Sequence, residues 1–214
     1  MKTILIANQK GGCGKTMAAI SLATALSQKG YHVALADADN QKSAMQWLKQ
    51  RIETAVPIAS LDWRHEKSIG DAPTNLDYLI IDAPGALSGK HAEQLVSEAH
   101  AVIVPLQPSF FDIDSTRRFL KRLNDIKKIR KGKVQILLLA NRVKSNASQS
   151  QDMLDFFTKI EQQPIAWISE RTAYSQLAMQ GLSIFDKSQK NFIEMQKQWY
   201  PLLSAVIEDP IAWF

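Results

Sequence analysis

Five short runs of almost entirely apolar residues recur along the chain, and a longer amphipathic stretch follows each of them. An apolar run of strand length is typical of a strand that is buried on both faces of a parallel sheet. Because consecutive parallel strands need a crossover connection, we expect an α/β fold: a mostly parallel, twisted sheet with helices on both faces and right-handed crossovers. The expected strands are ILIAN (4–8), VALAD (33–37), YLIID (78–82), AVIVPL (101–106) and ILLLAN (136–141).

The stretches between these runs have the residue spacing of amphipathic helices. Residues 60–75 are the least regular part of the chain, and we expect a loop there, with a short strand at PIASL (57–61). Beyond residue 168 we expect two more helical segments, around 174–180 and 187–207. No repeat, low-complexity tract or long linker divides the sequence, so one domain spanning residues 1–214 is expected. The other expected helices lie at 15–29, 41–51, 88–99, 112–130 and 148–162.

The composition limits the classes of protein to which the chain can belong. With 214 residues, 45% of them hydrophobic and 22% charged, it can bury one sizeable core. We find neither an apolar run of about eighteen residues nor a signal-peptide pattern, so a cytoplasmic protein is expected. The single cysteine, Cys13, excludes an internal disulfide and a cysteine-clustered metal site.

The stretch QKGGCGKT (9–16), between the first expected strand and the first expected helix, is typical of a phosphate-binding loop, or P-loop. Its glycines let backbone N–H groups turn toward phosphate oxygens, and the following helix adds its positive N-terminal end. Lys15 is expected to contact the terminal phosphates of a nucleotide, and the Thr16 hydroxyl to bind Mg²⁺. The predicted nucleotide-binding residues of this segment are Lys10, Gly11, Gly12, Cys13, Gly14, Lys15, Thr16 and Met17.

Carboxylates follow two other expected strands at the same edge of the sheet. Asp37 ends VALAD and Asp82 ends YLIID, which is the edge where ligands of parallel sheets bind. Both are therefore candidates for holding metal-bound water on Mg²⁺. Asp39 lies two residues beyond Asp37, so it is free to face the terminal phosphate as a general base or water-orienting group. The alternative is that Asp37 and Asp39 cap the next helix.

A second lysine, Lys10, lies at the mouth of the loop, and Gln9 replaces the usual first glycine. Because Lys15 already supplies the local cation, Lys10 is most useful if it reaches a phosphate from outside, as an arginine finger does in trans. The active site would then be complete only between two subunits. The alternative is a solvated lysine at the edge of a loop, and the residues alone leave both interpretations open.

The segment KGGCGKT resembles the deviant Walker A motif of the ParA/MinD superfamily of ATPases, in which the signature lysine reaches the ATP of the partner subunit. This resemblance implies a single-domain P-loop fold, ATP and Mg²⁺ as cofactors, and a homodimer in the ATP state with Lys10 acting in trans. Four further segments are similar to segments of the family and extend the match over nearly the whole chain: DADNQKS (37–43), LDYLIIDAPG (76–85), PLQPSFFDI (105–113) and ISERTAYSQLAMQGLSIFD (168–186).

The resemblance also implies roles for individual residues. Lys10, Lys15 and Asp39 are the expected catalytic residues, with Asp39 tied to hydrolysis. Thr16, Asp37 and Asp82 are the expected magnesium site. Asn141 corresponds to the asparagine that recognises adenine, although its position also suits a turn residue that ends a strand. Asn40 replaces the proline that the family commonly has after the second aspartate, a difference that concerns the rate of hydrolysis and not the fold.

A basic segment, RRFLKRLNDIKKIRKGK (117–133), carries nine basic residues and one acid, a net charge of +8 in a chain of net charge +5. The rest of the chain is therefore slightly acidic, and the segment is a candidate for binding DNA phosphates without reading bases. The alternative is a solvated helix face. The predicted DNA-binding residues are Arg117, Arg118, Lys121, Arg122, Lys127 and Lys128, with Lys187, Lys190 and Lys197 as further candidates on a late helix.

The sequence is similar to the short ParA type, because no helix-turn-helix segment precedes the loop. This implies an ATPase that is slow without its partner, binds non-specific DNA of the nucleoid, and is released by a cargo-bound, ParB-like adaptor. One cysteine per chain excludes an iron-sulfur reductase, and the ending EDPIAWF lacks the basic amphipathic helix of the membrane-binding branch, so no membrane partner is expected. Two alternatives remain: a small-molecule ligase on the same fold, and an ATP-switched dimer that docks on a protein or membrane surface.

Overall fold

A parallel sheet forms the centre of the computed structural model, which describes residues 1–64, 70–85, 89–144 and 147–207. Within these residues the sheet has seven strands in the order β3-β2-β4-β1-β5-β6-β7, and every neighbouring pair is parallel. The α/β fold class expected from the sequence is therefore confirmed. The strands are β1 (Lys2–Ile6), β2 (Val33–Asp37), β3 (Ala59–Asp62), β4 (Tyr78–Asp82), β5 (Ala101–Leu106), β6 (Gln135–Val143) and β7 (Ala166–Ser169).

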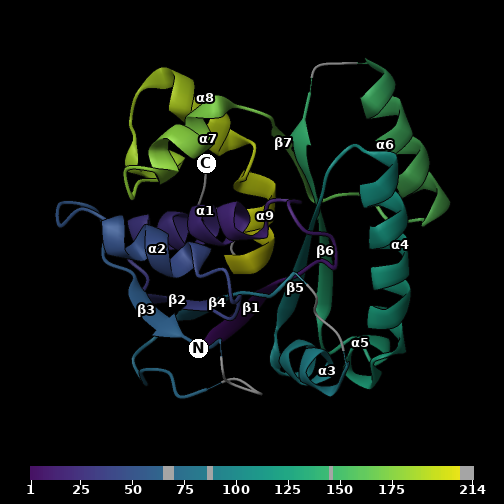
Figure 1. Cartoon of the computed structure of the whole chain (residues 1–214), viewed down its shortest axis with the longest axis horizontal. Helices are drawn as coiled ribbons and strands as arrows, with labels where there is room; N and C mark the ends of the chain where they lie inside the picture. The colour runs from purple at the N-terminus through teal and green to yellow at the C-terminus, as the bar shows by residue number, and fades with distance from the viewer. Residues whose placement is uncertain (65–69, 86–88, 145–146, 208–214) are drawn as a thin grey trace.

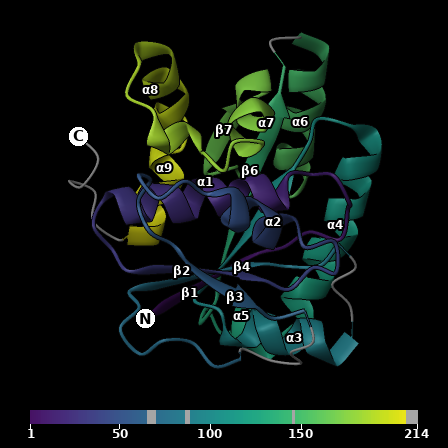
Figure 2. The same ribbon diagram turned by 60° about the vertical axis from the view of Figure 1, so that its left-hand side comes forward.

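Helices cover both faces of the sheet (Figures 1 and 2). Each face has its own apolar core, because side chains of a strand alternate between the two faces. In β1, Ile4 and Ile6 pack in one core, whereas Leu5 packs in the other. The first face carries α1 (Lys15–Gln28), α2 (Ser43–Gln50), α7 (Thr172–Ala178), the short helix η1 (Ile184–Asp186), α8 (Lys190–Lys197) and α9 (Tyr200–Ile207). The second face carries α3 (Gly89–Glu98), α4 (Phe110–Asp125), α5 (Lys127–Arg130) and α6 (Ala147–Lys159).

Three of the expected strands have the bounds predicted from the sequence, at 33–37, 78–82 and 101–106. Each of their residues is buried, as a central strand covered on both faces requires. The first strand lies two residues earlier than expected, at Lys2–Ile6, because the chain leaves the ladder before Asn8 to begin the loop.

Two expected helices are broken, and one strand was not expected. The helix predicted at 112–130 begins earlier, after the Ser109 side chain accepts a hydrogen bond from the Asp112 backbone, and it breaks at Ile126, whose backbone is extended. The segment 187–207 divides into α8 and α9, because Pro201 has no N–H to continue a helix. Strand β7 has only four residues, too few for a periodicity to indicate it. Among the described helices, none combines the length and the apolar character needed to cross a membrane.

Candidate functional site

The carboxyl ends of β1, β2 and β4 meet at one edge of the sheet. Asp37 of β2 is paired in register with Asp82 of β4, which is paired in turn with Ile6 of β1. The chain then forms the loop of residues 7–14 before α1 begins at Lys15. The sheet register therefore brings the glycine-rich loop and both aspartates together, as the sequence predicted for this edge.

Gly14 allows the loop to pass close to β6. Its φ is +95°, a left-handed conformation that favours glycine, and a Cβ atom there would lie 2.2 Å from Nδ2 of Asn141. Asn141 is buried, and its Nδ2 donates a hydrogen bond of 2.9 Å to the carbonyl of Cys13. A side chain at position 14 would therefore both strain the backbone and displace the asparagine.

Asn141 stabilises the loop through its hydrogen bond to Cys13. The family resemblance also makes it the expected base-binding residue. Its Oδ1 accepts a hydrogen bond of 3.0 Å from the backbone N–H of Arg142. One N–H of the amide and one lone pair of Oδ1 remain for a ligand. The structure thus supports the turn-stabilising interpretation directly, and adenine recognition by Asn141 stays a proposal.

Two further residues hold the loop, and sequence reasoning missed both. Asn8 is fully buried, and its Nδ2 donates to the carbonyl of Pro105 at 2.8 Å and to the Thr116 hydroxyl at 2.9 Å. Gln107, after β5, donates through Nε2 to the carbonyl of Gly12. Both contacts join segments about a hundred residues apart, and the amide at position 8 directly after an apolar run was the available signal.

The carboxylate of Asp82 is only partly compensated by its neighbours, and this is the observation that fits a bound metal ion. The residue is 1% exposed, and neither carboxylate oxygen accepts a hydrogen bond of ordinary geometry from a described residue. Burial raises the pKa of Asp82 to about 7, against the lowering effects of the Thr16 hydroxyl and the Lys15 ammonium. A buried carboxylate left in this state is costly unless a cation or ordered water satisfies it.

Mg²⁺ suits this group of residues. Within the described residues no three His, Cys, Asp or Glu side chains converge into a metal cage. Mg²⁺ prefers sites of this kind, in which one or two protein ligands are combined with waters and substrate phosphates. Thr16 and Asp82 would hold the ion, and the ion would neutralise charge on the phosphates.

Asp37 and Asp39 make different contacts from Asp82. Asp37 is fully buried and accepts hydrogen bonds from the backbone N–H groups of Asp39 (3.0 Å) and Met45 (2.9 Å), and burial raises its pKa. Because Met45 lies in the first turn of α2, Asp37 caps that helix, which is the alternative that the sequence left open. A role for Asp37 in holding metal-bound water remains a proposal.

Asp39 connects two of the loops at this edge. Its Oδ1 accepts from the backbone N–H of Gln41 at 3.0 Å, and its Oδ2 accepts from the backbone N–H of Gly85 at 3.1 Å. Gly85 follows β4, so this one carboxylate joins the loop after β2 to the loop after β4. Gly85 in turn lies beside Lys15, because a Cβ atom at position 85 would be 4.0 Å from Nζ of Lys15.

Lys10 and Cys13 have contrasting surroundings in the loop. Lys10 is half-buried, its backbone N–H donates to Oδ1 of Asn8 at 3.4 Å, and its ammonium forms no ion pair with any residue that the structure describes. Cys13 is fully buried, and burial raises the pKa of its thiol. Cys13 is therefore a packing residue, whereas the Lys10 side chain is available to a phosphate or a partner.

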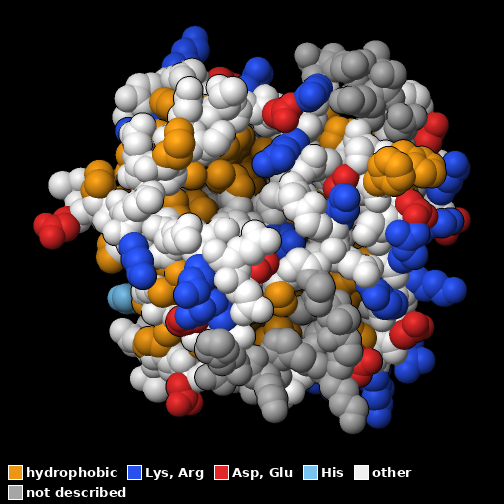
Figure 3. Space-filling view, in the orientation of Figure 1, with side chains coloured by type: hydrophobic (Ala, Val, Ile, Leu, Met, Phe, Trp, Pro, Cys, Tyr) orange, Lys and Arg blue, Asp and Glu red, His pale blue; other side chains and the backbone are white. Residues whose placement is uncertain are grey.

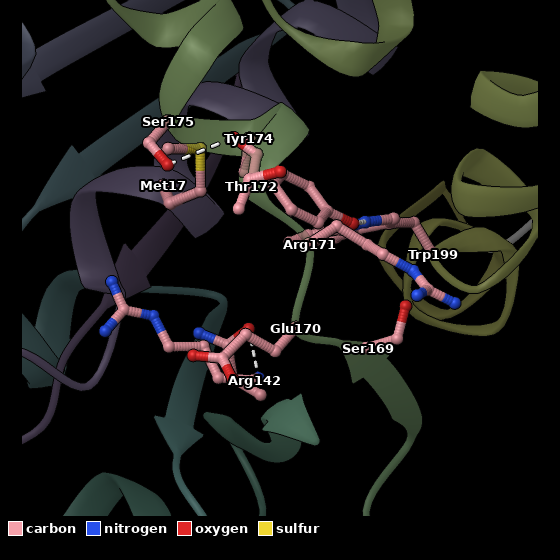
Figure 4. Close-up of a pocket in the computed structure, with 10 residues that line it drawn as sticks. Met17, Arg142, Ser169, Glu170, Arg171, Thr172, Tyr174, Ser175 and Trp199 are labelled. Atoms are coloured by element: carbon pink, nitrogen blue, oxygen red, sulfur yellow. Dashed lines mark hydrogen bonds between the residues drawn. The ribbon is translucent and has the colours of Figure 1, made fainter. Parts of the chain in front are cut away.

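Two cavities of about 440 Å³ each lie next to each other at this edge. The phosphate cavity is lined by Gly11, Gly12, Gly14, Lys15 and Thr16, and it continues past Asp39 to Trp47 and Met179. The second cavity, between the end of β6 and the segment after β7, is drawn in Figure 4. Two residues belong to the walls of both cavities, Met17 and Arg142.

An aromatic pair forms one wall of the second cavity. The indole Nε1 of Trp199 donates to the Tyr174 hydroxyl at 2.9 Å, and Trp199 is 1% exposed. Burial raises the pKa of Tyr174 to about 12. A cavity with an aromatic wall and a few polar groups, adjacent to a phosphate loop, has the character of a nucleoside pocket.

The basic segment lies on the surface over α4, α5 and the turn that follows, along one edge of the molecule (Figure 3). All six predicted DNA-binding residues of this segment are exposed. Arg117 and Arg118 pair with Asp114, one turn earlier on α4, and Arg122 donates to the side chain of Gln9. The net positive charge of this surface is therefore lower than the sequence of residues 117–133 suggests, because Asp114, which lies just before this segment, pairs with its first two arginines.

The late lysines are not part of this surface. Lys187 and Lys190 lie at η1 and at the start of α8, on the other side of the molecule from α4 in both ribbon views (Figures 1 and 2). Lys197 pairs with Glu194 at 2.7 Å on α8. One monomer thus presents two separate groups of the predicted DNA-binding residues.

Comparison with known proteins identifies similar chains. A family model described as the CobQ/CobB/MinD/ParA nucleotide binding domain matches residues 4–184. The maintenance of carboxysome distribution protein A of Halothiobacillus neapolitanus is 26% identical over 191 residues, which cover 86% of each chain. The chromosome-partitioning ATPase Soj of Thermus thermophilus is 30% identical over 158 residues, covering 59% of this chain and 63% of Soj. The structure of the Cyanothece McdA(D38A)–ATP complex superposes with a TM-score of 0.76 at 19% identity, covering 97% of this chain and 96% of that one.

Proposed function

The chain belongs to the CobQ/CobB/MinD/ParA nucleotide-binding family, and we propose that it is a positioning ATPase of the ParA/MinD type, with ATP and Mg²⁺ as its cofactors. Two relatives support this branch of the family, since one is a carboxysome distribution protein and the other a chromosome-partitioning ATPase. The cargo is a plasmid, a chromosome region or a protein body, and a cargo-bound, ParB-like adaptor stimulates hydrolysis.

The buried, only partly compensated carboxylate of Asp82 is the observation that carries the ATPase assignment. It lies beside Thr16 and Lys15 at the beginning of α1, and the N-terminal end of a helix after a glycine-rich loop is a typical phosphate-binding position. Thr16 and Asp82 would hold Mg²⁺ there, and the ion would supply positive charge to the phosphates of ATP. A buried and only partly compensated acid at this position is explained if the folded chain binds that cation there.

The residues of the site then have distinct roles in ATP binding and hydrolysis. Lys15 binds the terminal phosphates, and the loop N–H groups orient them. Asp39 orients the attacking water, since it lines the phosphate cavity and is fixed from two sides by the N–H groups of Gln41 and Gly85. Asn141 and the Tyr174–Trp199 wall receive the adenine, and Met17 lies between base and phosphates.

The positioning cycle adds a partner subunit and DNA. Lys10, whose ammonium has no ion-pair partner among the described residues, reaches the nucleotide of the second subunit, so that ATP holds a homodimer together. The basic residues of α4 and α5 then bind DNA phosphates, and pairing two subunits doubles the number of phosphate contacts. The protein is therefore nucleoid-associated in its ATP state and is released after hydrolysis.

Binding to non-specific duplex DNA tests this proposal. The pure protein is measured without nucleotide, with ADP, and with ATP plus Mg²⁺, each at about 50 and 200 mM salt, across which counterion release weakens phosphate-driven binding by orders of magnitude. Binding only with ATP, and its loss at the higher salt, is the expected result. ATP hydrolysis without DNA binding in any state would keep the ATPase and remove the nucleoid from the proposal.

A further inference from the structure

Arg142 has a backbone conformation that an arginine rarely adopts. Its φ is +52°, in the left-handed region where a side chain is strained. It lies near the carboxyl end of β6, where the register with β7 shifts between Ala140 and Val143. The Oδ1 of Asn141 accepts the Arg142 N–H, which fixes this turn. Such conformations persist where the surrounding structure holds them in place, and they cluster at functional sites.

The strained turn directs the Arg142 side chain to the boundary between two cavities. Arg142 lines both the phosphate cavity and the cavity with the Tyr174–Trp199 wall. In Figure 4 its side chain extends away from Tyr174 and Trp199. In an ordinary strand the residue after Asn141 would instead point to the opposite face of the sheet.

The guanidinium of Arg142 is available for a ligand. It is exposed, and it forms no ion pair with a described residue. Glu170, the acidic residue among those that line the second cavity, pairs with Lys144 at 3.4 Å. Of the residues that line the phosphate cavity, Lys15 and Arg142 are the basic ones. Two cations therefore face this cavity, one at the phosphate loop and one at its border with the second cavity.

We propose that Arg142 is a nucleotide-positioning residue that binds the phosphate chain of the bound nucleotide at its nucleoside end, within the same subunit. The inference rests on the proposed function, which puts the phosphates in one cavity and the nucleoside in the other. A guanidinium at the boundary meets the segment that joins them, and its paired N–H groups suit phosphate oxygens. Lys15 then holds the terminal phosphates and Arg142 the phosphate next to the ribose.

Substitution by glycine separates this role from a structural one. Arg142→Gly removes the guanidinium and also relieves the strain, because glycine adopts positive φ without steric cost. Its thermal midpoint is therefore expected at or above that of the wild type, so a loss of binding cannot be attributed to misfolding. Glu161→Gly is the matched control, since Glu161 is exposed, has a φ of +52° as well, and lies in the turn after α6 outside both cavities.

The readout is the affinity for ADP and for adenosine, measured by calorimetry and by ligand-observed NMR. Arg142→Gly is expected to weaken ADP binding about ten-fold or more, the range of a charge-assisted hydrogen bond, and to leave adenosine binding unchanged. Arg142→Lys, which keeps the charge without the planar fork, is expected to lie between the two. Glu161→Gly is expected to bind both ligands as the wild type does.

Unchanged ADP affinity in Arg142→Gly would overturn the proposal. An equal loss of affinity for ADP and for adenosine would overturn it as well, because it would mean that the residue only shapes the cavity. A failure of the proposed function gives a different result, because the wild type itself would then fail to bind ATP or ADP.

Discussion

Replacing Asp186 with alanine is expected to lower the free energy of unfolding by about 3 kcal/mol, because it leaves a buried guanidinium without its counter-charge. Arg51, directly after α2, forms a two-pronged ion pair with Asp186 of η1, with both N–O distances at 3.0 Å. The two side chains are only 6% and 5% exposed. Removal of one partner from such a pair typically costs about 3–5 kcal/mol, a large part of the stability of an ordinary domain.

The contacts that remain after each substitution set the magnitude. In Asp186→Ala, Arg51 keeps hydrogen bonds to the carbonyls of Val56 (2.9 Å) and Gly181 (3.2 Å), so the loss lies at the lower end, about 3 kcal/mol. Arg51→Ala removes these bonds, and also a guanidinium that lies 4.9 Å from the ring centroid of Trp47, so we expect about 4 kcal/mol.

The double variant tests whether the two residues act as a pair. With both side chains removed, no buried charge is left uncompensated, so the total loss is expected to stay near 4 kcal/mol and the coupling energy to be about 3 kcal/mol. Urea unfolding, followed by far-ultraviolet circular dichroism at pH 7, measures all four proteins, and an unchanged m-value confirms that the unfolding reaction is the same.

The exposed pair of Lys197 and Glu194 is the control. Their side chains are 54% and 57% exposed, and Lys197→Ala is expected to leave the stability essentially unchanged, because water screens an exposed ion pair. The reasoning is refuted if Asp186→Ala costs no more than this control, or if the losses of the two single variants at Arg51 and Asp186 simply add in the double variant.

Four further variants test residues of the site. Lys15→Ala is expected to abolish ATP binding in calorimetry, whereas Lys10→Ala keeps it and loses ATP-dependent dimerisation; a wild-type dimer fraction in analytical ultracentrifugation would contradict the role of Lys10 in trans. Asp39→Ala is expected to bind ATP, to release phosphate far more slowly and to accumulate as the ATP dimer, and wild-type turnover would exclude Asp39 from hydrolysis. Tyr174→Phe leaves the Trp199 indole N–H without its acceptor, at a cost of about 1–2 kcal/mol in urea unfolding. Because the pKa of Tyr174 is raised to about 12 from an unfolded value of about 10, the unfolded chain ionises first, and wild-type stability falls as the pH rises through this interval. The phenylalanine variant should lack this part of the fall, and an identical alkaline profile would show that Tyr174 is not the group responsible.

The fold was predictable from the sequence because each strand can be recognised from its own run of apolar residues. The runs at 33–37, 78–82 and 101–106 are apolar at nearly every position, and burial on both faces requires this of each strand separately. The sequence prediction failed where the deciding interaction is tertiary or the element is short. Strand β7, which was not predicted, is held by pairing with β6, and Ile126, where the predicted helix breaks, packs against the core on the second face of the sheet.

The candidate site was predictable in part for the same reason. The glycine loop and the aspartates after β2 and β4 follow recognisable strands, and the parallel sheet brings them to one edge. The sequence could not predict which aspartate is already satisfied. Asp37 receives two backbone hydrogen bonds from its own loop and helix, while Asp82 receives none of ordinary geometry from a described residue.

The parallel α/β fold, the phosphate loop and the identity of the acids beside it could thus be predicted from the residues alone, because they depend on local periodicity and on short motifs. The folded structure was needed to show that Asn8, Gln107 and Asn141 hold the loop, and that Arg142 lines two cavities. It also decided that Asp114 reduces the charge of the basic helix. These features depend on distances between segments far apart in the chain, and such distances are fixed only when the sheet pairs and the helices pack on it.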